Sequence, residues 1–179
     1  MSSRALSDPE FELRRLAALR QVRQIGDPVL RIPASEVTEF DDTLREQISR
    51  MELIMDEAVG AGLAAPQIGI SRRVLVYRLR DDETPRCLVN PRIIWASDEI
   101  EIDSEGCLSI GEVVVDVPRS VAIHVDANDG DGAEIHIEVE GFEARVIQHE
   151  MDHLDGILML DRTSKEDRRQ ALRELRVQN

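Results

Sequence analysis

Gln148-His149-Glu150-Met151-Asp152-His153 is the stretch around which the rest of the chain is organised. It contains His-Glu-x-x-His, a pattern in which one helix presents two imidazoles to a metal and keeps a carboxylate beside them. At 3.6 residues per turn, His149 and His153 lie one above the other on the same helix face. Glu150 is rotated by roughly 100° from that face, within reach of a water on the metal but outside a coordination position. Two imidazoles do not hold a divalent ion alone, so a third ligand must come from elsewhere.

Length and charge restrict the class of protein. The 179 residues suit one domain with a sizeable core and would be crowded for two. The formal net charge of -14 argues against broad electrostatic binding to nucleic acid, although a local basic patch is compatible with it. No apolar run approaches the ~20 residues of a membrane span, and residues 1–10 lack a signal-peptide pattern. We therefore expect a cytoplasmic protein with no membrane partner and no sequence-specific nucleic acid binding.

Apolar periodicity and turn signals predict an α+β fold in a single domain. Antiparallel strands are expected to pack around a central helix that carries the His-Glu-x-x-His motif, with further helices at the N- and C-terminal ends. Ser7-Asp8-Pro9-Glu10 has the composition of a helix start, Gly60 and Gly62 of a helix end, and Asn128 to Gly132 of a hairpin turn. The expected helices cover 11–24, 41–59, 142–154 and 164–175, and the expected strands 74–77, 88–95, 99–103, 113–117, 121–125, 135–139 and 157–160.

The sequence is expected to divide into three segments. Residues 1–24 are expected to form an N-terminal helical extension, residues 25–163 the main body of the domain, and residues 164–179 a C-terminal helix packed on that domain.

The two cysteines of the chain are the candidates for the third ligand. Cys87 begins an apolar run, which favours a small core residue. Cys107 lies in Glu105-Gly106-Cys107-Leu108-Ser109, a polar loop between expected strands, and loops supported by strands are where catalytic groups concentrate. In a reducing compartment a disulfide is not expected, so either thiol is free to act as a ligand or nucleophile.

A second loop, Gly60 to Gly69, is rich in small residues and holds one uncharged amide, Gln67. Small residues let a substrate backbone approach closely, and a Gln side chain donates to a developing oxyanion without needing a protonation change. The alternative is a tight helix-to-strand connection with a buried Gln, and the segment taken by itself favours that alternative.

Together these stretches resemble the three signature motifs of peptide deformylases, in the family's order and at its spacing. Shorter segments between about Ile25 and Asp161 are similar to the family as well. The three motifs are Gly60-Ala61-Gly62-Leu63-Ala64-Ala65-Pro66-Gln67, Glu105-Gly106-Cys107-Leu108-Ser109 and Gln148-His149-Glu150-x-x-His153. The chain departs from many relatives at Gly111, where they carry Pro.

The resemblance implies a catalytic metal site. Cys107, His149 and His153 would hold one divalent metal per chain, and an open fourth position is what metal-dependent hydrolysis needs. Ferrous iron is the family's usual ion in the cell, whereas Zn²⁺, Ni²⁺ or Co²⁺ can occupy the same ligands. The substrates implied are N-formylmethionyl peptides or nascent chains, from which the formyl group is released as formate.

Further roles are implied for residues around this metal. Glu150 would act as the proton shuttle, while the Gln67 side chain and the Leu108 backbone N–H would stabilise the oxyanion. The residues implied to bind substrate are Gly62, Ala61, Phe142 and Val146. Glu105 would orient neighbouring groups or pair with an arginine such as Arg119, and Gln148 would support the metal ligands or be solvated.

The two terminal helices have open roles. The C-terminal helix carries five basic residues, and by resemblance such a helix can dock on the ribosome, although a charged face is usually just solvated. The N-terminal helix is expected to pack on the domain or form a dimer contact. Two rival functions are a metalloprotease that uses the same helix motif without Cys107, and a non-catalytic metal-stabilised binding module.

Overall fold

The computed structural model describes residues 8–79, 82 and 84–178. A run of strands in the middle of the chain lies between helices at its two ends, which is the segregated order expected of an α+β protein and confirms the predicted fold class. The helices are α1 (Pro9–Leu19), α2 (Asp42–Glu57), α3 (Gly141–Leu154), α4 (Met159–Arg162) and α5 (Lys165–Gln178), with short 3-10 turns η2 (Pro28–Arg31) and η3 (Ala65–Ile68). The strands are β1 (Gly62–Ala64), β2 (Val74–Tyr77), β3 (Arg86–Ala96), β4 (Ile100–Gly106), β5 (Val114–Ser120), β6 (Ala122–Asn128) and β7 (Glu134–Glu140).

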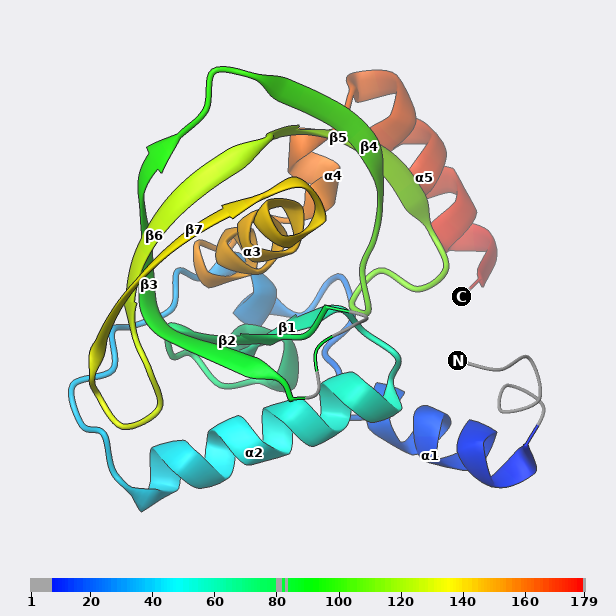
Figure 1. Cartoon of the computed structure of the whole chain (residues 1–179). Helices are drawn as coiled ribbons and strands as arrows, with labels where there is room; N and C mark the ends of the chain where they lie inside the picture. Colours follow the sequence, from blue (N-terminus) through cyan, green and yellow to red (C-terminus); the bar gives the residue numbers. More distant parts are fainter. Residues whose placement is uncertain (1–7, 80–81, 83, 179) are drawn as a thin grey trace.

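Two antiparallel sheets surround the central helix. One sheet has the order β1-β2-β3-β6-β7, and the other consists of β4 and β5. Figure 1 shows α3 enclosed by these strands, with β1 and β2 below it, β3, β6 and β7 beside it, and β4 and β5 above it. The residues of α3 from Ala144 to Leu154 are buried except for Gln148, so the helix has almost no solvated face. A helix buried on all sides is typical of a core element, and here it carries the metal motif.

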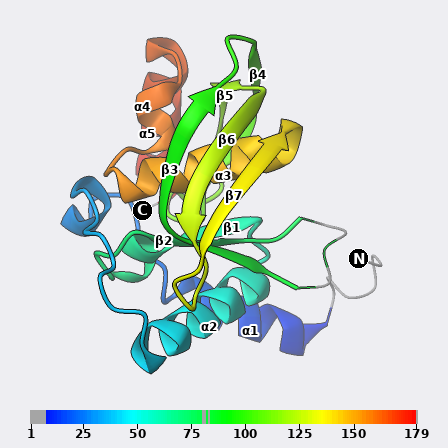
Figure 2. The ribbon, with the colours of Figure 1, turned by 60° about the vertical axis from the view of Figure 1, so that its left-hand side comes forward.

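The outer helices cover the remaining apolar surfaces. Helix α2 packs on β1 and β2 from the side opposite α3, and α1 lies against α2. Helix α5 packs on β5, where it buries Ala171 and Leu175. Figure 2 shows β3, β6 and β7 side by side in front of α3. No helix in the described part of the chain is long and apolar enough to cross a membrane.

The strand predicted over 157–160 is wrong. Leu158 is followed by the short helix α4, and the Asp161 carboxylate accepts a hydrogen bond from the Leu158 backbone N–H at 2.9 Å. Asp161 also pairs with Arg31. These polar contacts stabilise a helical turn in a run whose apolar composition alone does not distinguish strand from helix.

The first helix is shorter than predicted, because tertiary backbone hydrogen bonds engage the residues that follow it. Arg23 N–H donates to Gln67 O at 2.6 Å, and Ile25 N–H donates to Ser109 O at 2.8 Å. The helix therefore ends at Leu19, next to the loops of the site. At its start Asp8 is the N-cap, and Ser7, the first residue of the predicted helix start, lies outside the described residues.

The end of α2 also differs from the prediction. Helix α2 ends at Glu57, and the left-handed position after it is occupied by Val59 with φ +62° instead of by a glycine. A β-branched residue in this region is strained by roughly 1–3 kcal/mol. Residues 62–64, predicted as part of a loop, form strand β1 and pair with β2.

Candidate metal centre

Three potential metal ligands meet beside the central helix. Cys107 directly follows β4, and His149 and His153 stand one turn apart on α3. Their ligand atoms all lie within 4.8 Å of one another, and Cys107 Sγ is 3.2 Å from His153 Nε2. All three side chains are buried, with 7%, 9% and 1% of their surface exposed. The structure thus brings the predicted Cys107 together with the two histidines, whereas Cys87 packs partly buried against the core beneath α2.

Glu105 fixes the orientation of one of these imidazoles. Its Oε2 lies 2.9 Å from His149 Nδ1, which leaves His149 Nε2 free to face the cysteine. A carboxylate behind a ligating histidine sets the tautomer and makes the ring a better ligand. Burial alone would raise the pKa of Glu105, but hydrogen bonds from His149 and Arg119 outweigh it and lower that pKa to about 2. The two roles considered for Glu105 are therefore combined in one side chain, which contacts both His149 and Arg119.

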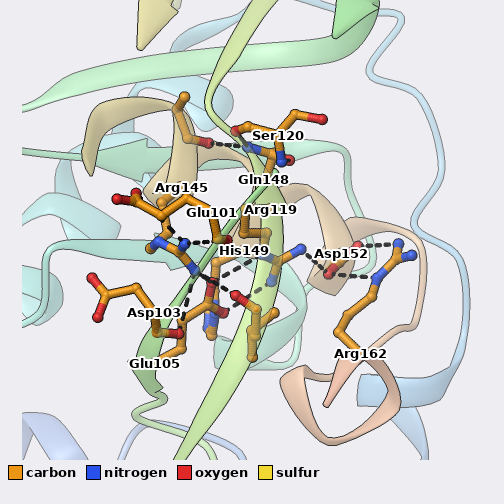
Figure 3. Close-up of polar contacts among 12 residues, drawn as sticks. Glu101, Asp103, Glu105, Arg119, Ser120, Arg145, Gln148, His149, Asp152 and Arg162 are labelled. Atoms are coloured by element: carbon orange, nitrogen blue, oxygen red, sulfur yellow. Dashed lines mark hydrogen bonds and ion pairs between the residues drawn. The ribbon is translucent and has the colours of Figure 1, made fainter. Parts of the chain in front are cut away.

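The same carboxylate belongs to a buried network of charges beneath the metal helix. Arg119 donates two bonds of 2.9 Å to Glu105 and one of 2.6 Å to Asp152. Figure 3 shows Asp152 in turn paired with Arg162, and Arg145 reaching Glu105 from α3. Removing one partner of such a buried pair typically costs about 3–5 kcal/mol, because the other charge is left unpaired. The network therefore holds α3 to β4 and β5 at a fixed position.

Glu150 lies beside the ligand cluster with one oxygen free. The residue is 4% exposed, and among the described residues no group donates to its Oε2. Burial raises the pKa of Glu150 to about 7. The backbone of β1 passes so close that a Cβ added at Gly62 would lie 2.5 Å from Glu150 Oε1. A glycine is therefore required at position 62 for Glu150 to occupy this place.

Gln67 points its amide nitrogen at the cluster. Gln67 Oε1 accepts from Ala64 N–H at 2.8 Å, which directs Nε2 toward Ser109 Oγ at 3.2 Å and Cys107 Sγ at 3.7 Å. The side chain is 2% exposed and belongs to the turn η3. Leu108, the other predicted oxyanion donor, is the residue next to the cysteine, and its carbonyl accepts from Gln24 at 3.1 Å. Both donors thus lie next to the sulfur.

A cavity of about 520 Å³ opens in front of these groups. The four residues predicted to bind substrate all line it, and Phe142 is 60% exposed at its wall. Helix α1 also contributes to the lining, which the sequence did not indicate. The lining includes Arg15, Leu16, Leu19, Val59, Ala61, Gly62, Gln67, Cys107, Leu108, Gly111, Phe142, Val146, His149 and Glu150.

The departure at Gly111 has a structural consequence. Gly111 adopts φ +69°, whereas proline fixes φ near −65°. A loop with proline at this place could not follow the same path, so the rim of the cavity here has its own shape.

The contacts of Gln148, which was expected to support the metal ligands or be solvated, and of two charged residues were not evident from the sequence. Gln148 holds the backbone of Ser120 on β5 through bonds of 2.9 and 3.2 Å, so it fastens α3 to a strand. The buried Asp152 and its exposed partner Arg162 were missed because their partners come from other elements. Their one local signal is that Arg145, His149 and Asp152 recur at helical spacing, as residues on one buried face do.

The donor set fits a first-row transition metal. One thiolate and two imidazoles suit zinc and its neighbours in softness, and three protein ligands leave room for a further ligand. The unpartnered Oε2 of Glu150 beside this set is suited to hydrogen-bond a molecule in that position. The residues present therefore form a possible metal site of catalytic rather than closed structural type.

Comparisons with known proteins agree on one family. The polypeptide deformylase family model matches residues 19–169. The peptide deformylase of Thermotoga sp. (strain RQ2) is 45% identical over 144 residues, covering 80% of this chain and 87% of the relative. The crystal structure of peptide deformylase from Thermotoga maritima has a TM-score of 0.78 at 45% identity, covering 80% of this chain and 96% of that one. A peptide deformylase from Synechococcus elongatus in complex with actinonin has a TM-score of 0.83 at 41% identity, covering 86% and 85%. The chain belongs to the peptide deformylase family.

Proposed function

We propose that this chain removes the formyl group from N-formylmethionyl peptides, including nascent chains, and releases formate. One observation carries the proposal: the Glu150 carboxylate and the Gln67 amide converge on the ligand cluster at the wall of an open cavity. An acid–base group, an oxyanion donor and a Lewis acid site in one place suit amide hydrolysis. Family membership favours this reaction over the two rival functions.

The metal would be held by Cys107, His149 and His153. A divalent ion in this place supplies Lewis acidity and makes a water molecule acidic enough to lose a proton near neutral pH. Fe²⁺ is the proposed ion in the cell, and the same donors accept Zn²⁺, Ni²⁺ or Co²⁺. Because thiolates close to iron are oxidised readily, the iron form is expected to lose activity in air.

Glu150 would move the proton. It accepts a proton from the attacking water, and then passes this proton to the amine nitrogen as the bond from the formyl carbon to nitrogen breaks. The products are formate and a free amino terminus. A carboxylate whose pKa is raised toward 7 is suited to both steps, since it neither holds nor rejects the proton strongly at neutral pH.

Gln67 and Leu108 would stabilise the charge that develops on the formyl oxygen. The Gln67 Nε2 group is directed toward the cluster by the bond that its Oε1 accepts from Ala64. The backbone N–H of Leu108 follows the cysteine directly. Preoriented donors of this kind need no reorganisation when the charge forms.

The peptide would lie along β1 with its methionine in the cavity. The backbone of Gly62 would pair with the peptide main chain, and Ala61, Phe142, Val146 and the apolar side of His149 would surround the methionine side chain. Helix α1 would form the wall for the residues that follow, since Leu16 and Val59 present exposed apolar surface to the same cavity.

Domain organisation and partners follow from this role. We infer a catalytic unit of residues 25–163 to which α1 and α5 are additions, and we place its work in the cytosol, where formylated chains are made. Helix α5 packs through Ala171 and Leu175 and leaves Arg169, Arg173 and Arg176 exposed. These arginines would contact ribosomal RNA. Reversing all three to Glu is expected to abolish co-sedimentation with ribosomes; unchanged co-sedimentation would remove the idea.

Formate release is the decisive test. Anaerobically prepared protein is incubated with formyl-Met-Ala-Ser, and formate and free Met-Ala-Ser are quantified. Equimolar formate and intact tripeptide support the proposal, whereas cleavage at an internal peptide bond would indicate a protease. The Cys107→Ser variant is expected to lose metal and activity; full activity in that variant would refute the site as described.

A further inference from the structure

A second group of potential ligands lies on the solvent side of the β6–β7 hairpin. His124 on β6 faces Glu138 on β7 in the strand register, and His136 is two residues from Glu138 on the same strand. Strand alternation directs all three outward, because Ile123 and Val125 pack inward. Their ligand atoms all lie within 4.8 Å of one another. These residues share no member with the Cys107 centre.

The distances suit one ion between the three side chains. His136 Nε2 lies 3.5 Å from Glu138 Oε1, and His124 Nε2 lies 4.0 Å from Glu138 Oε2. Two donors about 2.1 Å from a tetrahedral metal are about 3.4 Å apart. The same nitrogen of each imidazole thus addresses one carboxylate, and small side-chain rotations would bring all three atoms to coordination distance.

Both imidazoles are held in position from behind. His136 Nδ1 is 2.7 Å from Asp126 Oδ1, which directs Nε2 toward Glu138. A carboxylate behind a histidine is the usual support of a metal-binding imidazole. The ring of His124 lies 4.5 Å from the ring of Trp95, its neighbour on β3. Exposed ion pairs of this kind contribute about 0–1 kcal/mol to stability, so folding does not require the arrangement.

We propose that His124, His136 and Glu138 form a second, surface site for one divalent transition metal of the Zn²⁺, Ni²⁺ or Cu²⁺ class. Two imidazoles and one carboxylate favour these ions over Mg²⁺ and Ca²⁺, which take oxygen ligands. The net charge of -14 attracts cations to the surface in general. The site goes beyond deformylation and is independent of it, so a chain with both sites full would carry two ions.

Trp95 provides a direct readout, because it is the only tryptophan of the chain and its ring contacts His124. The enzyme is first loaded with Ni²⁺ and freed of excess metal, and is then titrated with further Ni²⁺. Because the Cys107 centre already holds the same ion, the titration does not change the metal there. We expect saturable quenching of Trp95 fluorescence with one added equivalent. His124→Gln and His136→Gln should weaken the apparent affinity at least tenfold.

Two controls separate this site from other effects. Glu134→Gln, an exposed carboxylate on the same face of β7, should leave the quenching unchanged. Formate release should be equal in all these variants, so the outcome is independent of the proposed function. Quenching that does not saturate, or that is equal in the wild type and both histidine variants, would overturn the proposal.

Discussion

Glu150 combines burial, a raised pKa and an oxygen without a partner among the described residues. The Glu150→Gln variant keeps the shape of the side chain but cannot carry the proton. We expect it to retain one metal per chain and to lose roughly 100- to 10,000-fold in kcat, the usual contribution of general acid–base catalysis. Metal content and formate release on the same sample check this. Loss of the metal would instead make Glu150 a ligand.

Gln67 is expected to act on the transition state and not on substrate binding. An oxyanion donor contributes about 3 kcal/mol, so Gln67→Ala should lower kcat by roughly 100-fold or more while KM changes little. A matched control is Gln47→Ala, which removes another buried amide in α2 that bonds Met51. Equal losses in both variants would point to a structural effect.

Because of Tyr77, the stability of the fold is expected to vary with pH in the alkaline range. It is the only tyrosine, it is 1% exposed, and its hydroxyl donates to Glu143 on α3 at 2.9 Å. Burial raises the pKa of Tyr77 from 10.0 to about 12. The folded state therefore holds this proton more tightly, and the stabilisation is complete below pH 10 and is lost as pH rises through 12.

We accordingly expect the free energy of unfolding to decrease between pH 10 and pH 12 more steeply in the wild type than in Tyr77→Phe. Urea unfolding at stepwise pH measures the decrease, and tyrosinate absorbance gives the midpoint. A midpoint near 10 in the folded protein would contradict the prediction.

Helix α3 shows which features of the site could be predicted from the sequence alone. The spacing of its two histidines placed both imidazoles and the carboxylate correctly relative to one another, because helix geometry is local. Cys107 required the family resemblance, since nothing in a Glu-Gly-Cys loop determines what it faces. Arg119 and Arg162 join Asp152 across 33 and 10 residues, and such pairings depend on the tertiary fold.

The boundaries and types of some elements were predicted wrongly because they also depend on specific hydrogen bonds. The helical turn α4 depends on a bond between Asp161 and the Leu158 backbone, and the early end of α1 depends on backbone bonds to distant loops. Apolar periodicity reports neither of these contacts. Strands β2 to β7 were predicted because alternation and turn residues are local signals, whereas the short strand β1 was missed.

Helix α1 is largely outside the segment that matches the family model, yet it lines the cavity. Leu16 is 49% exposed there, and covering it with a peptide side chain would contribute about 1 kcal/mol. We expect Leu16→Ser to raise KM for formyl-Met-Ala-Ser about fivefold at unchanged kcat. Leu13→Ser, more exposed on the same helix, is the matched control, and equal KM values in both variants would remove α1 from substrate binding.

At the scale of the whole molecule, a metal held by Cys107, His149 and His153 would join the end of β4 to the central helix. A ligand that binds only the folded state at 100 times its Kd contributes about 2.7 kcal/mol. Chelation should therefore lower Tm by about 5–10 °C for a domain of this size. Differential scanning calorimetry with and without chelator measures the shift. Cys107→Ser should respond little; an equal shift in that variant would mean that the chelator acts elsewhere.

The residues of the site come from distant parts of the chain. Gln67 lies in η3, about a third of the way along the sequence, and His149 and His153 lie on α3. A ribosome synthesises the chain from its amino end. The loops that hold Gln67 and Cys107 are therefore made before His149 and His153. A partly synthesised chain therefore lacks two of the three proposed metal ligands. With the proposed ligands, metal delivery would follow the synthesis of α3 and its packing against the strands that precede it.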